Sequence, residues 1–349
     1  MTPSIYISLN FMYNAGSGGV TDVAENLCNS LQMLEGSNIT IIRPSEKIRN
    51  KSIRRFMRFF SELLVSAGLP SNRSSVVVYP NYFFSPLSRR SVKHVALVHD
   101  LQFVAYPQYT SVLKRLWLSQ VYKMVKAYAD GVVFISQSTR DDFIKQYGAP
   151  KRYAVIYNPV FVEEKSTRAS SRYSPYAIAN FHFYPHKNIR KVLSIFSVIK
   201  SWQPTLKLLM TGTMPPSGTA EHSMLKSEGV VHLGYLPKAE VYDVINCSEF
   251  FISMSEFEGF NMAAAESAKA GKPLILSDIP VHREMFTGWA FFVKHDQADF
   301  PEQDLKSYLE NFDRTRSWAY SANTEGSQIA REYVRFLDSV VIRPAILTP

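Results

Sequence analysis

Between residues 253 and 273 the chain reads Ser253-Met-Ser-Glu-Phe-Glu-Gly-Phe-Asn-Met-Ala-Ala-Ala-Glu-Ser-Ala-Lys-Ala-Gly-Lys-Pro273. The alanine-rich run after Asn261 consists of strong helix formers and stops at the Gly-Lys-Pro sequence. This pattern predicts a strand, a glycine turn and then a helix. Such a turn leaves unpaired N–H groups and the positive end of the helix dipole exposed, which is a ready site for phosphate. Two carboxylates, Glu258 and Glu266, lie in the same stretch.

The composition limits what the whole chain can be. It has 349 residues, 46% of them hydrophobic, so we expect two globular domains with separate cores. Its two cysteines, Cys28 and Cys247, are far apart, which argues against a disulfide framework and fits a reducing cytoplasm. We expect neither a signal peptide nor a membrane-spanning helix. The net charge of +9 indicates an anionic partner, but charge alone does not choose between a nucleotide, a phospholipid surface and nucleic acid.

Short apolar runs alternate with longer amphipathic ones along the chain. The apolar runs are 4–9, 38–42, 75–79, 94–99, 131–135 and 153–157, followed by 176–181, 205–210, 229–233, 249–253, 272–276 and 289–293. The alternation predicts two parallel sheets covered by helices on both faces, so the expected fold class is α/β with two doubly wound, Rossmann-like domains. The polar segment 163–172 has linker composition, and Ser138 is the predicted N-cap of the helix after 131–135.

Two candidate ligand contacts lie in the first half of the chain. The loop after the first strand contains Gly16, Gly18 and Gly19, which either let the backbone approach a ligand or simply join strand to helix. The third glycine of a dinucleotide fingerprint is absent, which disfavours NAD. His99 and Asp100 end another strand, at the edge that faces the ligand crevice. His99 could hold a sugar hydroxyl or a phosphate and Asp100 could fix its tautomer or orient the loop, although a pair of this kind is usually structural.

Residues 47–67 carry a strongly one-sided charge. At helical spacing, Lys51, Arg54, Arg55 and Arg58 lie opposite an apolar face. A basic amphipathic helix with aromatic residues is typical of a segment that lies in the headgroup region of an anionic membrane. The same pattern fits a helix that packs on its own sheet and exposes a solvated basic face. The sequence leaves both interpretations open.

Lys187 stands just ahead of a predicted helix N-terminus, in the segment Pro185-His-Lys-Asn188. A lysine beside unpaired N–H groups is a natural partner for a diphosphate. The structural alternative is an exposed lysine near a helix cap. Because Glu258 and the turn at Gly259 lie in the same predicted domain, we favour the functional interpretation.

Four landmarks occur in the order found in glycosyltransferase family 4, and the chain resembles this family from the glycine loop almost to the C-terminus. The landmarks are the glycine loop, His99-Asp-Leu101, Pro185-His-Lys-Asn188, and Glu258-Gly-Phe with Glu266. The resemblance implies retaining enzymes of the GT-B fold, with two domains facing across a cleft. It further implies an acceptor-side domain over 1–165, a C-terminal helix at about 327–349 packed back on it, and a nucleotide-sugar-binding domain over 170–326.

The same resemblance implies roles in the second domain. Glu266 would hydrogen-bond the donor ribose, and Glu258 would lie beside the transferred sugar. Backbone N–H groups of Gly259, Phe260 and Asn261 would contact the sugar or the diphosphate. Asn261 replaces a family glycine, so its side chain either selects a donor hydroxyl or only tolerates a left-handed backbone.

The remaining roles concern the diphosphate and the first domain. Lys187 would neutralise the diphosphate as charge builds on the leaving group. His182 stands where the family often has arginine, which would make these contacts weaker or pH-sensitive. His99 would reach the sugar from the first domain, and the glycine loop would close against the diphosphate. In the family's mechanism the donor phosphate itself acts as the base, so neither a metal nor a cofactor is implied.

The resemblance therefore implies a retaining, metal-independent hexosyltransferase. The resemblance favours GDP-mannose as donor and a lipid-linked glycan as acceptor, such as one on polyprenyl diphosphate in lipopolysaccharide or O-antigen biosynthesis. We expect a cytoplasmic protein, peripheral on the inner face of an anionic membrane, without a nucleic-acid partner. One alternative is a nucleotide-sugar epimerase or hydrolase on the same fold, and another is a non-catalytic basic protein that binds nucleotides or membranes.

Overall fold

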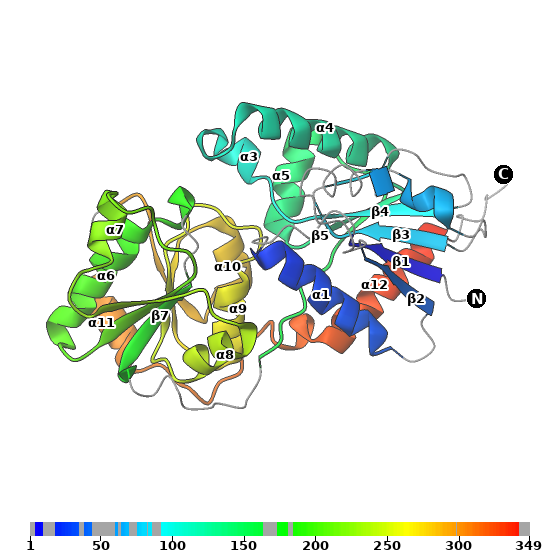
Figure 1. The fold of residues 1–349 in the computed structure, drawn as a ribbon. Helices are drawn as coiled ribbons and strands as arrows, with labels where there is room; N and C mark the ends of the chain where they lie inside the picture. The colour runs from blue at the N-terminus through cyan, green and yellow to red at the C-terminus, as the bar shows by residue number, and fades with distance from the viewer. Residues whose placement is uncertain are drawn as a thin grey trace. The chain divides into compact units, whose positions relative to one another are not determined.

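The chain divides into two compact units (Figure 1). One unit comprises Met1–Pro159 with Ala322–Pro349, and the other comprises Val160–Ser321. The computed structural model describes residues 4–9, 18–34, 38–43, 60–61, 64–69, 75–81, 83–85, 92–162, 173–180, 184–297 and 299–341. Within these ranges, no helix is both long and apolar enough to cross a bilayer.

The first unit is built on a six-stranded parallel sheet with the order β2-β1-β3-β4-β5-β6. Its strands are β1 (Ser4–Ser8), β2 (Asn38–Ile42), β3 (Ser75–Tyr79), β4 (Val92–Val98), β5 (Gly131–Phe134) and β6 (Tyr153–Val155). Every residue of β3 is buried, because a central parallel strand is covered by helices on both faces.

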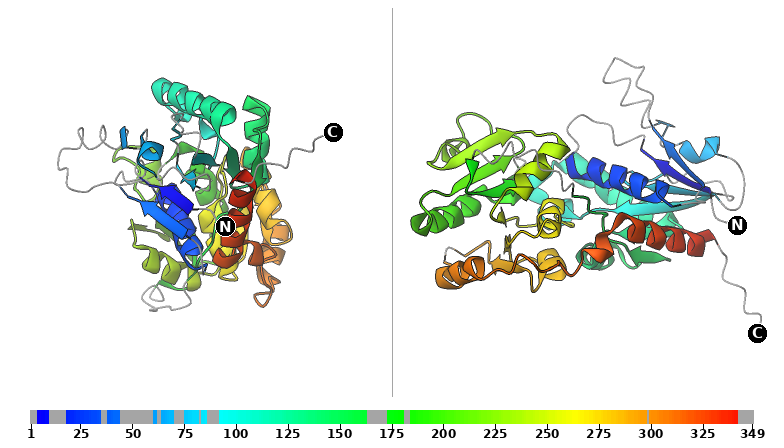
Figure 2. Two further views of the ribbon diagram at one scale, coloured as in Figure 1. Left: turned by 90° about the vertical axis from the view of Figure 1, so that its right-hand side faces the viewer. Right: turned by 90° about the horizontal axis from the view of Figure 1, so that it is seen from below.

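Helices from both ends of the chain cover this sheet. They are α1 (Gly18–Gln32), α3 (Gln102–Ala105), α4 (Val112–Tyr128), α5 (Gln137–Tyr147) and α12 (Gly326–Val341), with 3-10 turns η1 (Val65–Gly68) and η2 (Pro107–Tyr109). The C-terminal helix α12 packs beside α1 and against β3 and β4 (Figure 2). A Cβ atom on Gly131 would lie 2.8 Å from Cγ2 of Val340, so a glycine in β5 is what lets α12 approach the sheet.

The second unit has the same architecture. Its sheet is parallel and six-stranded, with the order β12-β11-β10-β7-β8-β9. The strands are β7 (Tyr176–Asn180), β8 (Lys207–Thr211), β9 (Val230–Gly234), β10 (Phe251–Ser253), β11 (Leu274–Ser277) and β12 (Ala290–Val293). The helices are α6 (Ile189–Trp202), α7 (Ala220–Met224), α8 (Lys238–Asn246), α9 (Met262–Lys269), α10 (Pro280–Phe286) and α11 (Glu302–Glu310), with the 3-10 turn η4 at Pro185–Lys187.

The predicted α/β fold is confirmed, and each of the twelve predicted apolar runs overlaps a strand. Strand ends differ by a few residues, because apolar residues continue from a strand into the neighbouring turn. The predicted N-cap Ser138 is wrong: Ser136 caps α5, and its hydroxyl accepts from the backbone N–H of Thr139 at 3.1 Å. The predicted linker 163–172 lies outside the described residues.

Candidate active site

The strand order of the second unit creates a switch point between β7 and β10. From β7 the chain proceeds outward through β8 to β9, and from β10 it proceeds in the opposite direction through β11 to β12. The loops after β7 and β10 therefore separate at the carboxyl edge of the sheet, which is where open α/β sheets bind ligands. Lys187 follows β7 and Glu258 follows β10, so the topology brings together two residues distant in sequence.

An ion pair joins these two residues. Nζ of Lys187 lies 2.5 Å from Oε1 of Glu258, and the hydroxyl of Ser255 donates to the same oxygen at 2.7 Å. The side chains are 24% and 13% exposed, respectively. Burial raises the pKa of Glu258, but the charge and hydrogen bond of Lys187 and the Ser255 hydroxyl outweigh burial and hold that pKa below its usual value. Glu258 is therefore an ionised carboxylate with a cation beside it.

Local caps fix the positions of both residues. Lys187 ends the η4 turn, and Asn188 follows with φ of 47° as the N-cap of α6, accepting from the N–H of Lys191. Asn261 caps α9 in the same way, with φ of 66° and its Oδ1 accepting from the N–H of Ala264 at 3.2 Å. Asparagine tolerates this left-handed conformation better than most residues. Two asparagine caps thus hold the two loops of the site.

The side chain of Asn261 points into the protein and is hydrogen-bonded there. Its Nδ2 donates to the hydroxyl of Ser253 at 3.2 Å and lies 2.8 Å from Nε2 of His282. Asn261 is only 9% exposed. Of the two roles predicted for this residue, the structure shows the left-handed backbone position, and its amide supports the loop that carries Glu258.

The buried imidazole of His282 contacts both Asn261 and Ser277 beneath the loop that carries Glu258. Its Nδ1 lies 2.8 Å from the carbonyl oxygen of Ser277, which places the proton on Nδ1 and leaves Nε2 to accept from Asn261. The hydroxyl of Ser277 donates to the carbonyl of Ser255 at 2.5 Å, and Ser255 in turn donates to Glu258. A continuous chain of hydrogen bonds therefore runs from α10 to the ion pair.

The stability of the protein is expected to fall as the pH drops from 7 to 5, in part because of His282. Burial lowers its pKa from 6.5 to about 4, against the opposing pull of Glu258. As the pH falls, the imidazole of His282 therefore takes up a proton in the unfolded state before it does so in the folded state. Its contribution to the free energy of unfolding is complete above pH 6.5 and is lost as the pH falls toward 4. Between pH 7 and pH 5, His282 alone should lower the free energy of unfolding by about 2 kcal/mol.

Urea unfolding of the wild type and of His282→Asn at the two pH values tests this expectation. The variant should show a pH dependence smaller by about 2 kcal/mol, because it no longer takes up the proton on unfolding. His94 in the first unit has its pKa lowered to about 4 by burial in the same way, so His94→Asn serves as a positive control for the size of such a change. An unchanged pH dependence in His282→Asn would contradict a neutral, buried imidazole.

Glu266 lies on α9 and is 1% exposed. Its Oε1 contacts Nζ of Lys238 at 2.5 Å, and that ammonium also lies 5.1 Å from the ring centre of Tyr242. Lys238 is the first residue of α8, so the cation reaches Glu266 from a neighbouring helix. Glu266 thus forms a second buried carboxylate with a lysine partner in the same unit.

The first unit holds His99 at the end of β4. The imidazole is 3% exposed, and its Nε2–H donates to the carbonyl of Pro80 at 3.0 Å. Burial lowers the pKa of His99, although the Pro80 carbonyl and Asp100 oppose the shift, so the ring is neutral. The Oδ1 of Asp100 accepts from the N–H of Gln102. Pro80, rather than Asp100, therefore fixes the tautomer, and Asp100 orients the following loop.

The glycine loop and the remaining candidates are only partly described. Gly18 and Gly19 form the first turn of α1, and no atom among the described residues lies within 4 Å of a Cβ added to Gly19. Packing within the described part of the unit therefore does not require a glycine there. Gly16, His182, Lys51, Arg54, Arg55 and Arg58 lie outside the described residues. Gly259 and Phe260 lie in the bend before α9, and Phe260 is buried.

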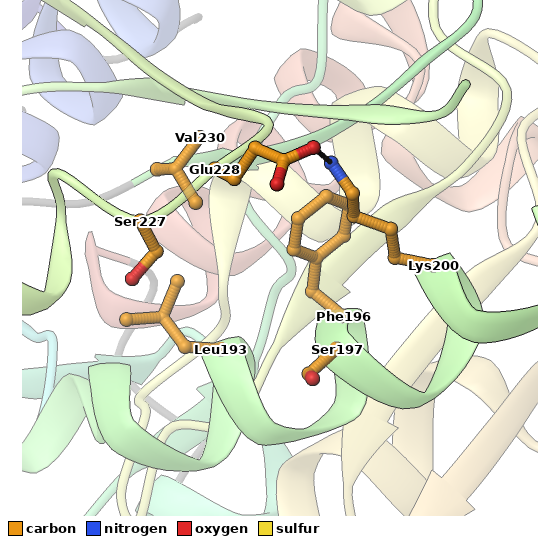
Figure 3. A pocket seen from close by; sticks show the side chains of 7 residues that line it. All are labelled: Leu193, Phe196, Ser197, Lys200, Ser227, Glu228 and Val230. Atoms are coloured by element: carbon orange, nitrogen blue, oxygen red, sulfur yellow. Dashed lines mark hydrogen bonds and ion pairs between the residues drawn. The ribbon is translucent and has the colours of Figure 1, made fainter. Parts of the chain in front are cut away.

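A pocket of about 140 Å³ lies elsewhere in the second unit (Figure 3). It is lined by Leu193, Phe196, Ser197, Lys200, Ser227, Glu228 and Val230. Its charged groups, Lys200 and Glu228, pair with each other at 3.3 Å. The pocket borders the C-terminal half of α6, whereas the chain enters α6 from Lys187 at the carboxyl edge of the sheet. We therefore place the active site at the switch point and not in this pocket. Within the described ranges, no cluster of three or more His, Cys, Asp or Glu side chains could hold a metal ion.

The sequence prediction missed the residues that support the site. Ser255, Ser277, His282 and Lys238 were not predicted as functional. Ser277 is the last residue of β11, the strand next to β10, and His282 follows it in α10, so their position at the carboxyl edge was the available signal. No sequence signal pairs Lys238 with Glu266, because that contact depends on how α8 packs against α9.

Comparison with known proteins identifies the class. Residues 17–164 match the model described as Glycosyltransferase Family 4, and residues 168–324 match the model described as Glycosyl transferases group 1. Together the two matches cover residues 17 to 324, apart from 165–167. The chain belongs to the two-domain glycosyltransferases of family 4, with the GT-B fold.

Solved structures show the same fold. The Anabaena protein Alr3699/HepE, solved with UDP and glucose, superimposes with a TM-score of 0.67 over 97% of this chain and 100% of that one, at 13% identity. WaaG, a glycosyltransferase involved in lipopolysaccharide biosynthesis, gives a TM-score of 0.60 over 97% and 98%, also at 13% identity.

Curated relatives are more similar in sequence. The O-antigen chain mannosyltransferase RfbU of Salmonella typhimurium is 26% identical over 231 residues, which are 62% of this chain and 60% of that protein. The GDP-mannose:cellobiosyl-diphosphopolyprenol alpha-mannosyltransferase of Xanthomonas oryzae is 25% identical over 239 residues, 65% of this chain and 63% of that protein. The match spans less than two thirds of the length of either relative.

Proposed function

We propose that this protein is a retaining glycosyltransferase that moves a hexose from a nucleoside diphosphate donor to a lipid-linked glycan. The observation that carries the proposal is the meeting of Lys187 and Glu258 at the switch point of the second unit, at 2.5 Å. A cation suits a diphosphate, and carboxylates such as Glu258 and Glu266 suit the hydroxyls of a sugar and a ribose. The names of the mannosyltransferase relatives favour GDP-mannose as the donor and a polyprenyl diphosphate-linked acceptor.

The proposed reaction uses no cofactor and proceeds by the mechanism that the family resemblance implies. The acceptor hydroxyl forms a bond to the anomeric carbon on the face that the diphosphate leaves, and the bond from that carbon to the phosphate oxygen breaks. The hydroxyl proton passes to the departing phosphate oxygen. Lys187 exchanges Glu258 for the diphosphate and stabilises the negative charge that develops there. Glu258 then accepts from sugar hydroxyls, and the hydrogen bonds from His282 through Ser255 hold it in place.

Release of nucleoside diphosphate with and without acceptor tests the proposal. We expect release from GDP-mannose to depend on a polyprenyl diphosphate-linked glycan, because the acceptor hydroxyl is the nucleophile. Equal turnover without acceptor would instead indicate a hydrolase, and conversion of the donor sugar would indicate an epimerase. Failure of every nucleotide sugar to bind would favour a non-catalytic protein.

We further propose that the protein works on the inner face of the cytoplasmic membrane, where a lipid-linked acceptor is presented. The basic segment with Lys51, Arg54, Arg55 and Arg58 supports this location by its composition. Flotation of wild type and of a variant with the three arginines replaced by glutamine, on anionic phospholipid vesicles, tests this location: the variant should bind less, and equal binding would contradict a membrane contact through this segment.

A further inference from the structure

The ion pair between Lys238 and Glu266 has one buried and one accessible partner. The ammonium lies 2.5 Å from Oε1 of the carboxylate, and the lysine side chain is 39% exposed whereas that of Glu266 is 1% exposed. Removing a carboxylate from water is costly, and a hydrogen-bonded cation beside it offsets that cost. Solvent therefore reaches the lysine of this pair much more than the carboxylate.

The strand order places this pair at the ligand-binding edge of the second sheet. Helix α8 follows β9 and α9 follows β10, so both helices begin at the carboxyl edge. Lys238 is the first residue of α8, and Glu266 is the fifth residue of α9. Figure 1 shows these two helices side by side. The pair therefore belongs to the same edge of the sheet as Lys187 and Glu258.

A buried aromatic ring also holds the lysine. Tyr242 stands four residues farther along α8, on the same face of the helix, and is 4% exposed. The ammonium of Lys238 lies 5.1 Å from the centre of its ring, a position in which the ring attracts a cation. An ordinary exposed lysine loses many rotamers when it forms a salt bridge. The ring of Tyr242 already restricts Lys238 to the region beside Glu266.

The chemistry of the pair suits the hydroxyls of a nucleoside. An ionised carboxylate only accepts hydrogen bonds, and the two hydroxyls of a ribose can both donate. An ammonium at this distance favours the ionised form of a carboxylate and fixes the direction in which it points. The orientation of Glu266 therefore depends on where Lys238 lies.

We propose that Lys238 is a positioning residue of the nucleoside subsite, which holds Glu266 in the orientation that accepts from the ribose hydroxyls of the donor. The inference rests on the proposed function, in which Glu266 binds the ribose, and it adds the residue that fixes this contact. Lys238 acts through Glu266 and not on the bond that breaks. Its effect on donor binding is therefore similar in the ground state and the transition state.

Calorimetry with GDP and UDP, each beside its 2′,3′-dideoxy form, tests the proposal on the full chain. Wild type should bind its nucleotide about 10- to 100-fold more tightly than the dideoxy form, which lacks the charge-assisted hydrogen bonds. In Lys238→Met this ratio should fall to about threefold or less, because the carboxylate is no longer aligned. A merely structural loss would weaken both forms by the same factor and leave the ratio intact. In steady-state kinetics the donor KM should rise about tenfold, with kcat within about twofold of wild type.

A double variant shows whether Lys238 acts through Glu266. Substitutions of two residues that act as one unit are not additive, so Lys238→Met/Glu266→Gln should bind the nucleotide within about twofold of Glu266→Gln alone. Lys306→Met is the matched control. Its ammonium also lies near a carboxylate, 3.9 Å from Glu310, and over a ring, 5.8 Å from the centre of Trp202, but it belongs to α11 and lies outside the proposed donor site. Its nucleotide affinity should equal that of wild type.

Three results would overturn the proposal. The first is a hydroxyl ratio in Lys238→Met equal to that of wild type. The second is additive losses in the double variant, which would give Lys238 a ligand contact of its own. The third is tighter nucleotide binding by Lys238→Met, which would make the lysine a competitor that the ribose displaces. Failure of the proposed function looks different, because wild type would then bind neither GDP nor UDP.

Discussion

Replacing Lys187 by methionine is expected to lower kcat/KM for the nucleotide-sugar donor by about 100- to 1000-fold. The ammonium supplies the positive charge that the diphosphate needs as it leaves, and the residues described around it contribute Glu258 and Ser255, neither of which is a cation. The effect should appear mainly in kcat, because charge on the leaving group is greatest in the transition state. Steady-state kinetics with saturating acceptor measure it.

The same substitution also removes the partner of a buried carboxylate. Without Lys187, burial raises the pKa of Glu258 against the smaller opposing effects of the Ser255 hydroxyl and His282, so some loss of stability should accompany the loss of activity. The double variant Lys187→Met/Glu258→Gln separates the two effects, since it should recover stability but not activity. Lys200→Met is the matched control, because it breaks an ion pair with Glu228 at the other end of α6 and should leave kcat/KM within about twofold of wild type. Full activity in Lys187→Met would contradict the assigned role.

Glu266→Gln is expected to raise the donor KM by about 10- to 100-fold, with a smaller effect on kcat. A carboxylate that accepts from ribose hydroxyls makes charge-assisted hydrogen bonds, each worth about 1.5–3 kcal/mol, and these contacts are similar in the ground state and the transition state. Lys238 would keep a hydrogen-bond acceptor in the amide oxygen, so the helix contact should survive. Donor titrations and calorimetry with the nucleoside diphosphate measure the change.

The control for Glu266→Gln is Glu249→Gln. Glu249 is also a paired carboxylate of the second unit, 2.9 Å from Arg314, but it precedes β10 at the amino edge of the sheet. Its substitution should leave nucleotide affinity unchanged. Equal nucleotide affinity in Glu266→Gln and wild type would contradict a ribose contact, even if activity fell for other reasons.

The sequence predicted the strands well because both sheets are parallel and buried. A strand such as β3, with Val76, Val77 and Val78 all at 0% exposure, must be a continuous apolar run, and such runs are visible without a structure. Lys187 and Glu258 were each predicted after a strand, and all strands of a parallel sheet end at the same edge, whereas the switch point itself depends on the strand order, which was not predicted. The location of both candidates at one edge could therefore be predicted.

Side-chain networks could not be predicted in the same way. Whether Asn261 selects a sugar or supports the loop depends on what lies beneath it, and His282 reaches it from a helix 21 residues farther along the chain. The tautomer of His99 depends on the Pro80 carbonyl, from a neighbouring strand end. Such contacts are set by tertiary packing, which leaves no local pattern in the sequence.

The central claim is that the second unit binds a nucleoside diphosphate through Lys187 and Glu266. Thermal unfolding of wild type, Lys187→Met and Glu266→Gln with GDP, UDP, dTDP and ADP tests it most directly. At a hundredfold excess over its Kd, one diphosphate, with GDP favoured, should raise the wild-type Tm by about 5 °C and shift the two variants far less. If no diphosphate shifts the wild type, or if both variants respond as wild type does, the proposed nucleotide site at Lys187 and Glu266 is wrong.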